Sequence, residues 1–272
     1  MKLEEKVGAR LHPTAEIHPS AELGQEVEVG PYAVIGPNVV IGDGTRIESH
    51  AVIEPFTTLG ANCVIKSHAV LGGEPQDHKF SGERSYLVLG EHNIIREFVT
   101  LHRATGEEQA TVLGDHNMIM AYCHIGHNCT FGSNISMANG VGVSGHVIVE
   151  DRVVFGGMVG VHQFVKIGQL AMVGGMSKVE QDIPPYMKAD GRPAEVYDLN
   201  IIGCRRAGIR DTVRAELKLA YKLLYRSGFN VSQAIEAIDA EVPPSPERDY
   251  LLNFVKNIKY GYRGRQLDTP RA

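Results

Sequence analysis

The segment AYCHIGHNCTFG, residues 121–132, holds side chains that could bind a metal ion or move a proton. His124 and His127 lie three residues apart, and Cys123 and Cys129 flank them. Imidazole and thiolate groups are the usual protein ligands of zinc, and an imidazole is also the commonest general base near neutral pH. The spacing alone selects neither chemistry, so the backbone elements that carry these residues must decide between them.

A repeat of six residues runs through the first two thirds of the chain. A large apolar residue recurs at every sixth position from Leu11 to Val179, and the frame is broken only at Asp77, Glu83 and Glu107. A period of six fits neither an α-helix nor a simple strand. It is typical of a parallel β-helix in which each coil has three short sides and points one large residue inward from each side.

The breaks in the repeat indicate where the chain leaves the coil. They predict extruded loops near 73–85 and 104–110, and loops on a rigid scaffold often carry function. The repeat stops at residue 182, and the spacing of apolar residues beyond it favours α-helices. We therefore expect a mainly β protein with two domains, a hexapeptide-repeat β-helix over 1–182 and a small α-helical C-terminal domain over 183–272.

The same frame assigns the cysteines to the interior of the coil. Four residues after each large inward residue is a second inward position, which usually holds Ala, Val or Thr. Cys63, Cys123 and Cys129 occupy that position, so we interpret them as core residues and not as zinc ligands. Glycine often follows the large inward residue, as at Gly24 and Gly42, where we expect a positive φ angle.

The histidines do not follow this core pattern. If three sides of about six residues form one coil of about 18, then His127, His146 and His162 fall on three successive coils at nearly the same corner. Parallel strands stack about 4.8 Å apart, so the three imidazoles should cluster along one edge. Such a cluster suits a metal site like that of the hexapeptide carbonic anhydrases, or a general base. A surface ladder without function and a pure interaction scaffold are the remaining alternatives.

Composition narrows the class of protein further. The net charge of the 272 residues is −5, which argues against nucleic acid as the main partner. The start of the chain has no apolar stretch of the signal-peptide kind, and no segment is long and apolar enough to span a membrane. We expect a cytoplasmic protein without membrane insertion. Residues 183–272 carry a net charge of +4, against −9 before them, and so form a possible docking surface for an acidic partner.

Longer motifs carry a specific resemblance. HIGHNCTFG, SGHVIV, GGMVGVHQFVKIG, GGMSKVEQDIPPY, NIIGCRRAG and YKLLYRSG together resemble the acyl-[acyl-carrier-protein]–UDP-N-acetylglucosamine O-acyltransferase family of hexapeptide-repeat acyltransferases. The resemblance covers essentially the whole chain. It implies a left-handed β-helix, a homotrimer, and neither a cofactor nor a bound metal. The implied reaction moves a 3-hydroxyacyl group from acyl carrier protein to the 3-hydroxyl of UDP-N-acetylglucosamine, the first step of lipid A biosynthesis.

The resemblance also implies roles for individual residues. His127 matches the general base, and Gly145 matches the backbone amide that stabilises the oxyanion. Gly175 matches the position that limits acyl length, where glycine leaves the groove open for a longer chain. The other matched residues are substrate contacts: Asp77, Lys79, His102, His124, His146, His162, Gln163, Asn200 and Arg206.

Three positions depart from the family pattern. Asn128 follows the base where the best-known members have Asp, and an amide can orient an imidazole but adds no charge. Ile202 stands where some members have Glu, and Pro193 replaces a histidine near the acyl groove. Because some relatives acylate a 3-amino sugar, N-acylation of such an analogue stays an alternative. An ester product that is labile to alkali would argue against it.

Overall fold

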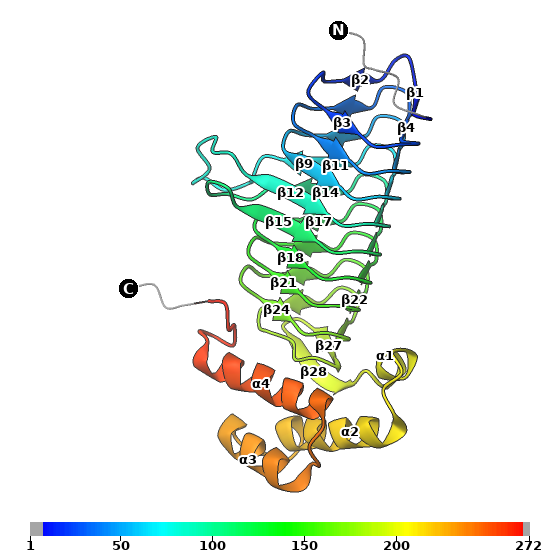
Figure 1. Cartoon of the computed structure of the whole chain (residues 1–272). Helices are drawn as coiled ribbons and strands as arrows, with labels where there is room; N and C mark the ends of the chain where they lie inside the picture. The colour runs from blue at the N-terminus through cyan, green and yellow to red at the C-terminus, as the bar shows by residue number, and fades with distance from the viewer. Residues whose placement is uncertain (1–7, 269–272) are drawn as a thin grey trace.

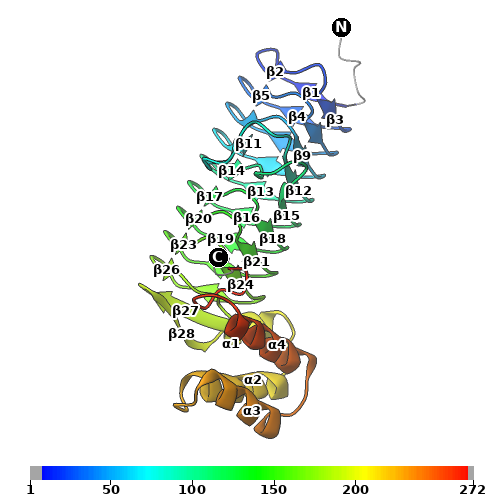
Figure 2. The same ribbon diagram turned by 90° about the vertical axis from the view of Figure 1, so that its left-hand side faces the viewer.

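The β-helix predicted from the repeat is present, and a small group of helices lies at its C-terminal end (Figure 1). The structure is a computed structural model and describes residues 8–268. Residues 1–7, which belong to the start of the chain where no signal peptide is expected, lie outside the described residues. Each coil contributes one short strand to each of three parallel sheets, named here A, B and C, and the coils stack into a column (Figure 2).

The strands are short, and most have two residues. Sheet A contains β1 (Arg10–Leu11), β4 (Glu28–Val29), β7 (Arg46–Ile47), β10 (Val64–Ile65), β13 (Ile94–Ile95), β16 (Met118–Ile119), β19 (Ser136–Met137), β22 (Val154–Phe155), β25 (Met172–Val173), β27 (Met187–Gly191) and β28 (Ala194–Leu199). Sheet B contains β2 (Glu16–Ile17), β5 (Val34–Ile35), β8 (Val52–Ile53), β11 (Val70–Gly73), β14 (Thr100–His102), β17 (His124–Ile125), β20 (Gly142–Val143), β23 (Gly160–Val161) and β26 (Lys178–Val179). Sheet C contains β3 (Glu22–Leu23), β6 (Val40–Ile41), β9 (Thr57–Leu59), β12 (Tyr86–Leu89), β15 (Ala110–Leu113), β18 (Thr130–Phe131), β21 (Ile148–Val149) and β24 (Lys166–Ile167).

The large residue of each six-residue side points into the column. Neighbouring coils place these residues over one another, as Ile35 over Ile53 and Val143 over Val161, and all four are buried. Burial of one such side chain contributes about 1.5–3 kcal/mol, so the stack as a whole forms the core. The second inward position holds three cysteines, which are buried and form no disulfide, as expected for core residues: Cys63, Cys123 and Cys129.

Glycine is required after the large inward residue for a reason other than the predicted one. Neither Gly24 nor Gly42 has the positive φ angle expected for it; positive φ occurs two residues later, at Glu26 and Gly44. A Cβ on Gly42 would instead lie 2.6 Å from the backbone nitrogen of Ala61 in the next coil. The close stacking of successive coils therefore excludes a side chain there, whereas the φ angle does not require glycine.

Two loops leave the column at the same edge. Residues 74–85 connect β11 to β12, and residues 103–109 connect β14 to β15, so both run from sheet B to sheet C. They project together from one side of the column (Figure 1). The connections from β17 to β18, from β20 to β21 and from β23 to β24 pass along the same edge, which is called the B–C corner below.

The chain beyond the last coil begins with strands, although the sequence pattern predicts helix directly after residue 182. Strands β27 and β28 form an antiparallel hairpin that extends sheet A beyond β25. Met187, Ala189 and Leu199 are buried, so the hairpin covers the open end of the column with apolar side chains. A helix at this position could not continue the backbone hydrogen bonds of β25.

Four helices follow the hairpin: α1 (Ile201–Arg206), α2 (Asp211–Tyr225), α3 (Val231–Glu241) and α4 (Pro246–Tyr260). Two of these helices begin with side-chain caps, since Asn230 and Gln233 form a capping box at α3 and the side chain of Ser245 accepts a hydrogen bond from the first turn of α4. Helix α4 is joined to the column where Tyr250 Oη donates to Glu150 Oε2 at 2.5 Å. In the described part of the chain, no helix is long and apolar enough to cross a membrane.

Candidate active site

The histidines with a common phase in the repeat lie at the B–C corner. His127 follows β17, His146 follows β20 and His162 follows β23. The rings of His127 and His146 are 5.1 Å apart and nearly perpendicular. The ring stacked against the other side of His146 belongs to Phe164, at 4.9 Å. His162 is exposed instead, and its Nδ1 lies 2.9 Å from the carbonyl oxygen of Gln163.

The register of the coils explains why His162 does not join the stack. Strands β20 and β23 belong to successive coils, and Gly142 pairs with Gly160, 18 residues later in the chain. The residue one coil beyond His146 is therefore Phe164, and the residue one coil beyond His127 is Gly145. The three histidines share a corner, but relative to His127 the position of His146 is one residue later in its coil and that of His162 is one residue earlier. His146 and His162 are therefore two residues out of phase, and their rings do not stack.

Gly145 makes room for the imidazole of His127. A Cβ on Gly145 would lie 2.7 Å from Nε2 and 2.8 Å from Cε1 of that ring, closer than side-chain atoms approach one another. The ring therefore packs directly against the glycine. Among the hydrogen bonds of the described residues, none uses the N–H of Gly145 as donor, so this N–H is available to an acceptor outside the chain.

Asn128 determines which nitrogen of His127 carries the proton. Nδ1 of His127 lies 2.8 Å from Oδ1 of Asn128. The backbone of Thr105 fixes the orientation of that amide, because its N–H donates to Oδ1 and its carbonyl accepts from Nδ2, both at 3.0 Å. Since an oxygen faces Nδ1, that nitrogen must be the donor. Neutral His127 therefore has its lone pair on Nε2, the nitrogen beside Gly145.

Two further histidines extend the cluster toward the loops. His124, on β17, has its ring 5.1 Å from that of His102, and its Nδ1 lies 2.8 Å from Thr100 Oγ1. Burial, followed by the nearby His102 and His127, lowers the pKa of His124 to about 4. Burial is also the main cause that lowers the pKa of His102 and of His146. These three imidazoles are neutral at pH 7 and can donate or accept hydrogen bonds.

Asp77 and Lys79 reach the same corner from the first loop. Asp77 Oδ1 accepts a hydrogen bond from the backbone N–H of Lys79 at 3.0 Å. Burial and His127 lower the pKa of His146, whereas the charge of Asp77 raises it and that of Lys79 lowers it. Both loop charges are therefore close enough to act on that ring. The repeat could not place these residues, because it stops where the loop leaves the coil.

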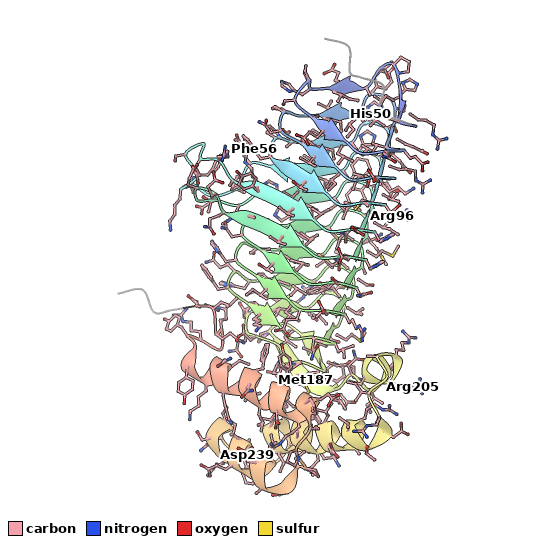
Figure 3. The ribbon with its side chains drawn as sticks, viewed as in Figure 1. His50, Phe56, Arg96, Met187, Arg205 and Asp239 are labelled. Atoms are coloured by element: carbon pink, nitrogen blue, oxygen red, sulfur yellow. The ribbon has the colours of Figure 1, made fainter. Side chains whose placement is uncertain are left out.

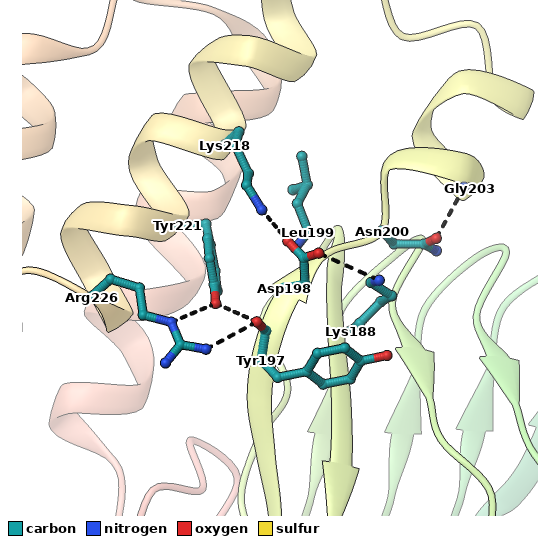
Figure 4. Close-up of polar contacts among 9 residues, drawn as sticks. All are labelled: Lys188, Tyr197, Asp198, Leu199, Asn200, Gly203, Lys218, Tyr221 and Arg226. Atoms are coloured by element: carbon teal, nitrogen blue, oxygen red, sulfur yellow. Dashed lines mark hydrogen bonds and ion pairs between the residues drawn. The ribbon is translucent and has the colours of Figure 1, made fainter.

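Three of the predicted site residues lie at other edges. Asn200 caps α1, where its Oδ1 accepts from Gly203 N at 3.0 Å (Figure 4), and its Nδ2 donates to the carbonyl of Leu170 at 2.8 Å. Leu170 lies between β24 and β25, at the corner between sheets C and A. Arg206 is exposed in the last turn of α1. Gly175 precedes β26, at the corner between sheets A and B.

Helix α1 is therefore remote from the histidines of its own chain. Arg205, on α1, and Phe56, at the B–C corner, lie on opposite sides of the molecule (Figure 3). Asp198 on β28 pairs with Lys188 on β27 and with Lys218 on α2, which joins the hairpin to that helix (Figure 4), and Asn200 holds the start of α1 to the carbonyl of Leu170. One chain thus presents the base and the loops at one edge and the arginines of α1 at another.

The cysteines and histidines form no metal centre in the part of the chain that the structure describes. Within residues 8–268 no group of three or more His, Cys, Asp or Glu side chains is arranged to hold a metal ion. Cys129 is buried in the coil, and this burial raises the pKa of its thiol to about 12, as expected for a core residue. The cluster is better suited to proton transfer and hydrogen bonding.

The chain is similar to known proteins along most of its length. A family model described as "Udp N-acetylglucosamine O-acyltransferase; Domain 2" matches residues 182–264. A Gloeothece citriformis protein named acyl-[acyl-carrier-protein]–UDP-N-acetylglucosamine O-acyltransferase is 47% identical over 170 residues, and the match spans 62% of each chain. A protein of the same name from Anaeromyxobacter sp. strain K is 42% identical over 191 residues, 70% of this chain and 74% of that one.

Solved structures extend the likeness to nearly the whole chain. The UDP-N-acetylglucosamine acyltransferase of Bacteroides fragilis superposes with a TM-score of 0.88 at 38% identity, and the match covers 90% of this chain and 96% of that one. The column is accordingly a left-handed parallel β-helix followed by a small helical part, as the resemblance predicts. The chain belongs to the acyl-[acyl-carrier-protein]–UDP-N-acetylglucosamine O-acyltransferase family.

Proposed function

We propose that this protein transfers a 3-hydroxyacyl group from the thioester of acyl carrier protein to the 3-hydroxyl of UDP-N-acetylglucosamine, the first step of lipid A biosynthesis. The observation that carries the proposal is the pairing of His127 with Gly145. A base with its lone pair on Nε2 lies against a residue whose backbone N–H has no partner among the described residues. Acyl transfer to a hydroxyl needs both of these groups within reach of one carbonyl.

The reaction follows from these two groups. Nε2 of His127 takes the proton of the sugar 3-hydroxyl while the hydroxyl oxygen attacks the thioester carbon. The N–H of Gly145 donates to the carbonyl oxygen as negative charge develops on it. When the intermediate collapses, the carbon–sulfur bond breaks, and the imidazolium returns its proton to the leaving thiolate. Asn128 accepts from Nδ1 throughout, so His127 ends the cycle in its starting tautomer.

The other residues of the B–C corner are proposed to bind the nucleotide sugar. Asp77 and Lys79 would contact the sugar from the first loop, because their charges already act on the neighbouring His146. Neutral imidazoles beside the base can hydrogen-bond hydroxyl and amide groups of the substrate without competing for its proton. The residues assigned to this role are His102, His124, His146, His162 and Gln163.

The position of α1 supports a site that a second chain completes. Asn200 and Arg206 are proposed to serve the B–C corner of a neighbouring subunit in a homotrimer, since α1, which holds them, lies at another edge of their own chain. Arg205, Arg206 and Arg210 are exposed, and none of them forms an ion pair within the described residues. They form a basic surface suited to the acidic acyl carrier protein. Both substrates imply a cytoplasmic location.

The test is to identify the product. Purified protein is incubated with UDP-N-acetylglucosamine and a mixture of 3-hydroxyacyl carrier proteins, and the products are separated and weighed by mass spectrometry. We expect a singly acylated nucleotide sugar whose acyl group is released by mild alkali, as an ester requires. An alkali-stable product formed only from a 3-amino analogue would contradict O-acylation and favour the amide-forming alternative.

Acyl length should depend on Gly175. This residue lies across sheet B from His127, three strand spacings or about 14 Å along the column. The outward positions between them are Gly142 and Gly160, where an added Cβ would meet nothing within 4 Å, so the surface is open to a chain. We expect the substitution Gly175→Met to shift the preferred donor to a shorter 3-hydroxyacyl group.

Competition between donors of different length measures this shift. Wild-type protein and Gly175→Met each receive an equimolar mixture of carrier proteins, and the product masses give the preference. The fold should tolerate the change, because a Cβ at residue 175 would lie 3.3 Å from the carbonyl oxygen of Gly157 and needs only a small adjustment. An unchanged length preference would remove Gly175 from this role.

A further inference from the structure

A chain of hydrogen bonds connects the first loop to the second loop beneath His127. The carboxylate of Glu83 accepts from the backbone N–H and the hydroxyl of Ser81 on one oxygen, at 2.8 and 3.1 Å. Its other oxygen accepts from the hydroxyl of Thr105 at 2.9 Å and from the N–H of Gly106 at 2.8 Å. The N–H groups of Gly106 and Ser81 are the main causes that lower the pKa of Glu83 to about 2, so the carboxylate is ionised under all ordinary conditions.

The second loop passes this restraint on to the base. The backbone of Thr105 holds both ends of the Asn128 side chain, the oxygen through its N–H and the amide nitrogen through its carbonyl. Oδ1 of Asn128 in turn faces Nδ1 of His127 at 2.8 Å. Four residues therefore connect in series: Glu83, Thr105, Asn128 and His127.

An asparagine beside a general base needs such a restraint, whereas an aspartate does not. Both oxygens of a carboxylate accept hydrogen bonds, so a rotation by half a turn leaves the neighbouring imidazole unchanged. If the amide of Asn128 turned over, its Nδ2–H would face Nδ1 of His127. That arrangement would favour a lone pair on Nδ1 and a proton on Nε2, and Nε2 could then no longer accept the proton of the substrate.

We propose that Glu83 is a positioning residue for His127, which acts through Thr105 to keep Oδ1 of Asn128 turned toward the imidazole. The inference rests on the proposed role of His127 as general base. It adds that the first loop, which carries Asp77 and Lys79 to the substrate, also sets the tautomer of the base. The order of the first loop is thereby coupled to the tautomer of His127.

A purely structural role for Glu83 would have different consequences. The two loops are also joined further out, where Tyr86 Oη donates to Glu108 Oε2 at 2.8 Å. That bond does not involve Thr105 or Asn128, so Tyr86→Phe is a matched control that loosens the loops without touching the relay. Loss of loop order alone would weaken substrate binding and raise KM, while a wrong tautomer lowers kcat.

The experiment compares Glu83→Gln with Tyr86→Phe by steady-state kinetics and by the ¹⁵N chemical shifts of the histidine side chains, with His127 assigned from His127→Ala. In Glu83→Gln an NH₂ group replaces one carboxylate oxygen. That group cannot accept hydrogen bonds from the two donors it faces, so one of the two pairs of hydrogen bonds is lost. We expect kcat to fall about tenfold or more with KM for UDP-N-acetylglucosamine nearly unchanged. The His127 spectrum should change from one with the proton on Nδ1 to a mixture of tautomers. Tyr86→Phe should keep the kcat of the wild type and the proton on Nδ1 of His127, and any effect of looser loops should fall on KM alone.

A double-mutant cycle supplies the decisive comparison. In an Asn128→Asp background both side-chain oxygens accept, so Glu83→Gln should lower kcat by a clearly smaller factor than it does beside Asn128. An equal factor in both backgrounds would overturn the proposal, and so would a raised KM with an unaltered tautomer of His127. The NMR measurement uses the free protein, so it tests the relay even if acyl transfer itself is not observed.

Discussion

Replacement of His127 by alanine is expected to lower kcat for acyl transfer by roughly 10²- to 10⁴-fold, the usual contribution of a general base. The loss follows because no other imidazole takes over Nε2 beside Gly145. The pKa of His124 is lowered to about 4, so this ring is a weak base, and its Nδ1 is engaged by Thr100. KM for the nucleotide sugar should change little, since the binding residues remain. Initial rates from product mass spectrometry measure both constants.

A histidine at another corner is the matched control. His116 stacks on His92 at 4.7 Å, between β15 and β16, and so lies at the edge between sheets C and A. His116→Ala should leave the rate within about twofold of the wild type because the ring contacts neither substrate nor base. Retention of most activity in His127→Ala, with the circular dichroism spectrum unchanged, would contradict the assignment of the base.

The His127→Ala variant also tests whether the site is shared between chains. In a homotrimer whose site takes His127 from one subunit and Arg206 from the next, both His127→Ala and Arg206→Ala should be nearly inactive alone. Co-expression of the two variants creates mixed trimers, and in every mixed trimer one site contains both residues. Recovery of activity in mixed trimers isolated with two different affinity tags would support the shared site. No recovery would show that each chain uses its own Arg206 or none.

The sequence predicts the fold well because the repeat is a local signal with a single physical cause. One large apolar residue at every sixth position can be buried only if the chain coils with three sides, and that arrangement places Ile35 and Val143 over their counterparts in the next coil. The hairpin formed by β27 and β28 escaped prediction, because it is held by sheet A and by burial under the last coil, and neither constraint is visible in its own residues.

The site is predictable only where it follows the repeat. Counting in coils places His127 and His146 together, but it also groups His162 with them, although the ring one coil beyond His146 is that of Phe164, two residues further along. The contacts of Glu83 and Thr105 are also beyond this reasoning. They join two loops that have left the coil, and side-chain contacts between loops have no period in the sequence. The resemblance to a family names residues of these loops, but it does not explain how Asn128 serves in place of aspartate.

Substitution of Gly145 by alanine is expected to reduce kcat almost as much as the loss of His127. Alanine keeps the backbone N–H that is proposed to stabilise the oxyanion, so any loss must come from the added methyl group. That group would lie 2.7 Å from Nε2 of His127. The imidazole must therefore rotate away, which breaks its contact with Asn128 and moves Nε2 off the substrate hydroxyl. Displacement of a catalytic group by about 1 Å can already cost about 100-fold in rate.

The fold should tolerate this change, which makes the result interpretable. Gly145 is not among the residues with a positive φ angle, so an alanine is compatible with its backbone. The circular dichroism spectrum of Gly145→Ala should match that of the wild type, which separates a displaced imidazole from a damaged fold. The double variant His127→Ala, Gly145→Ala should be no slower than His127→Ala alone, since both changes remove the same base. A further loss in the double variant would mean that Gly145 acts on the oxyanion independently of the ring, and full activity of Gly145→Ala would mean that Nε2 of His127 does not lie where the reaction occurs.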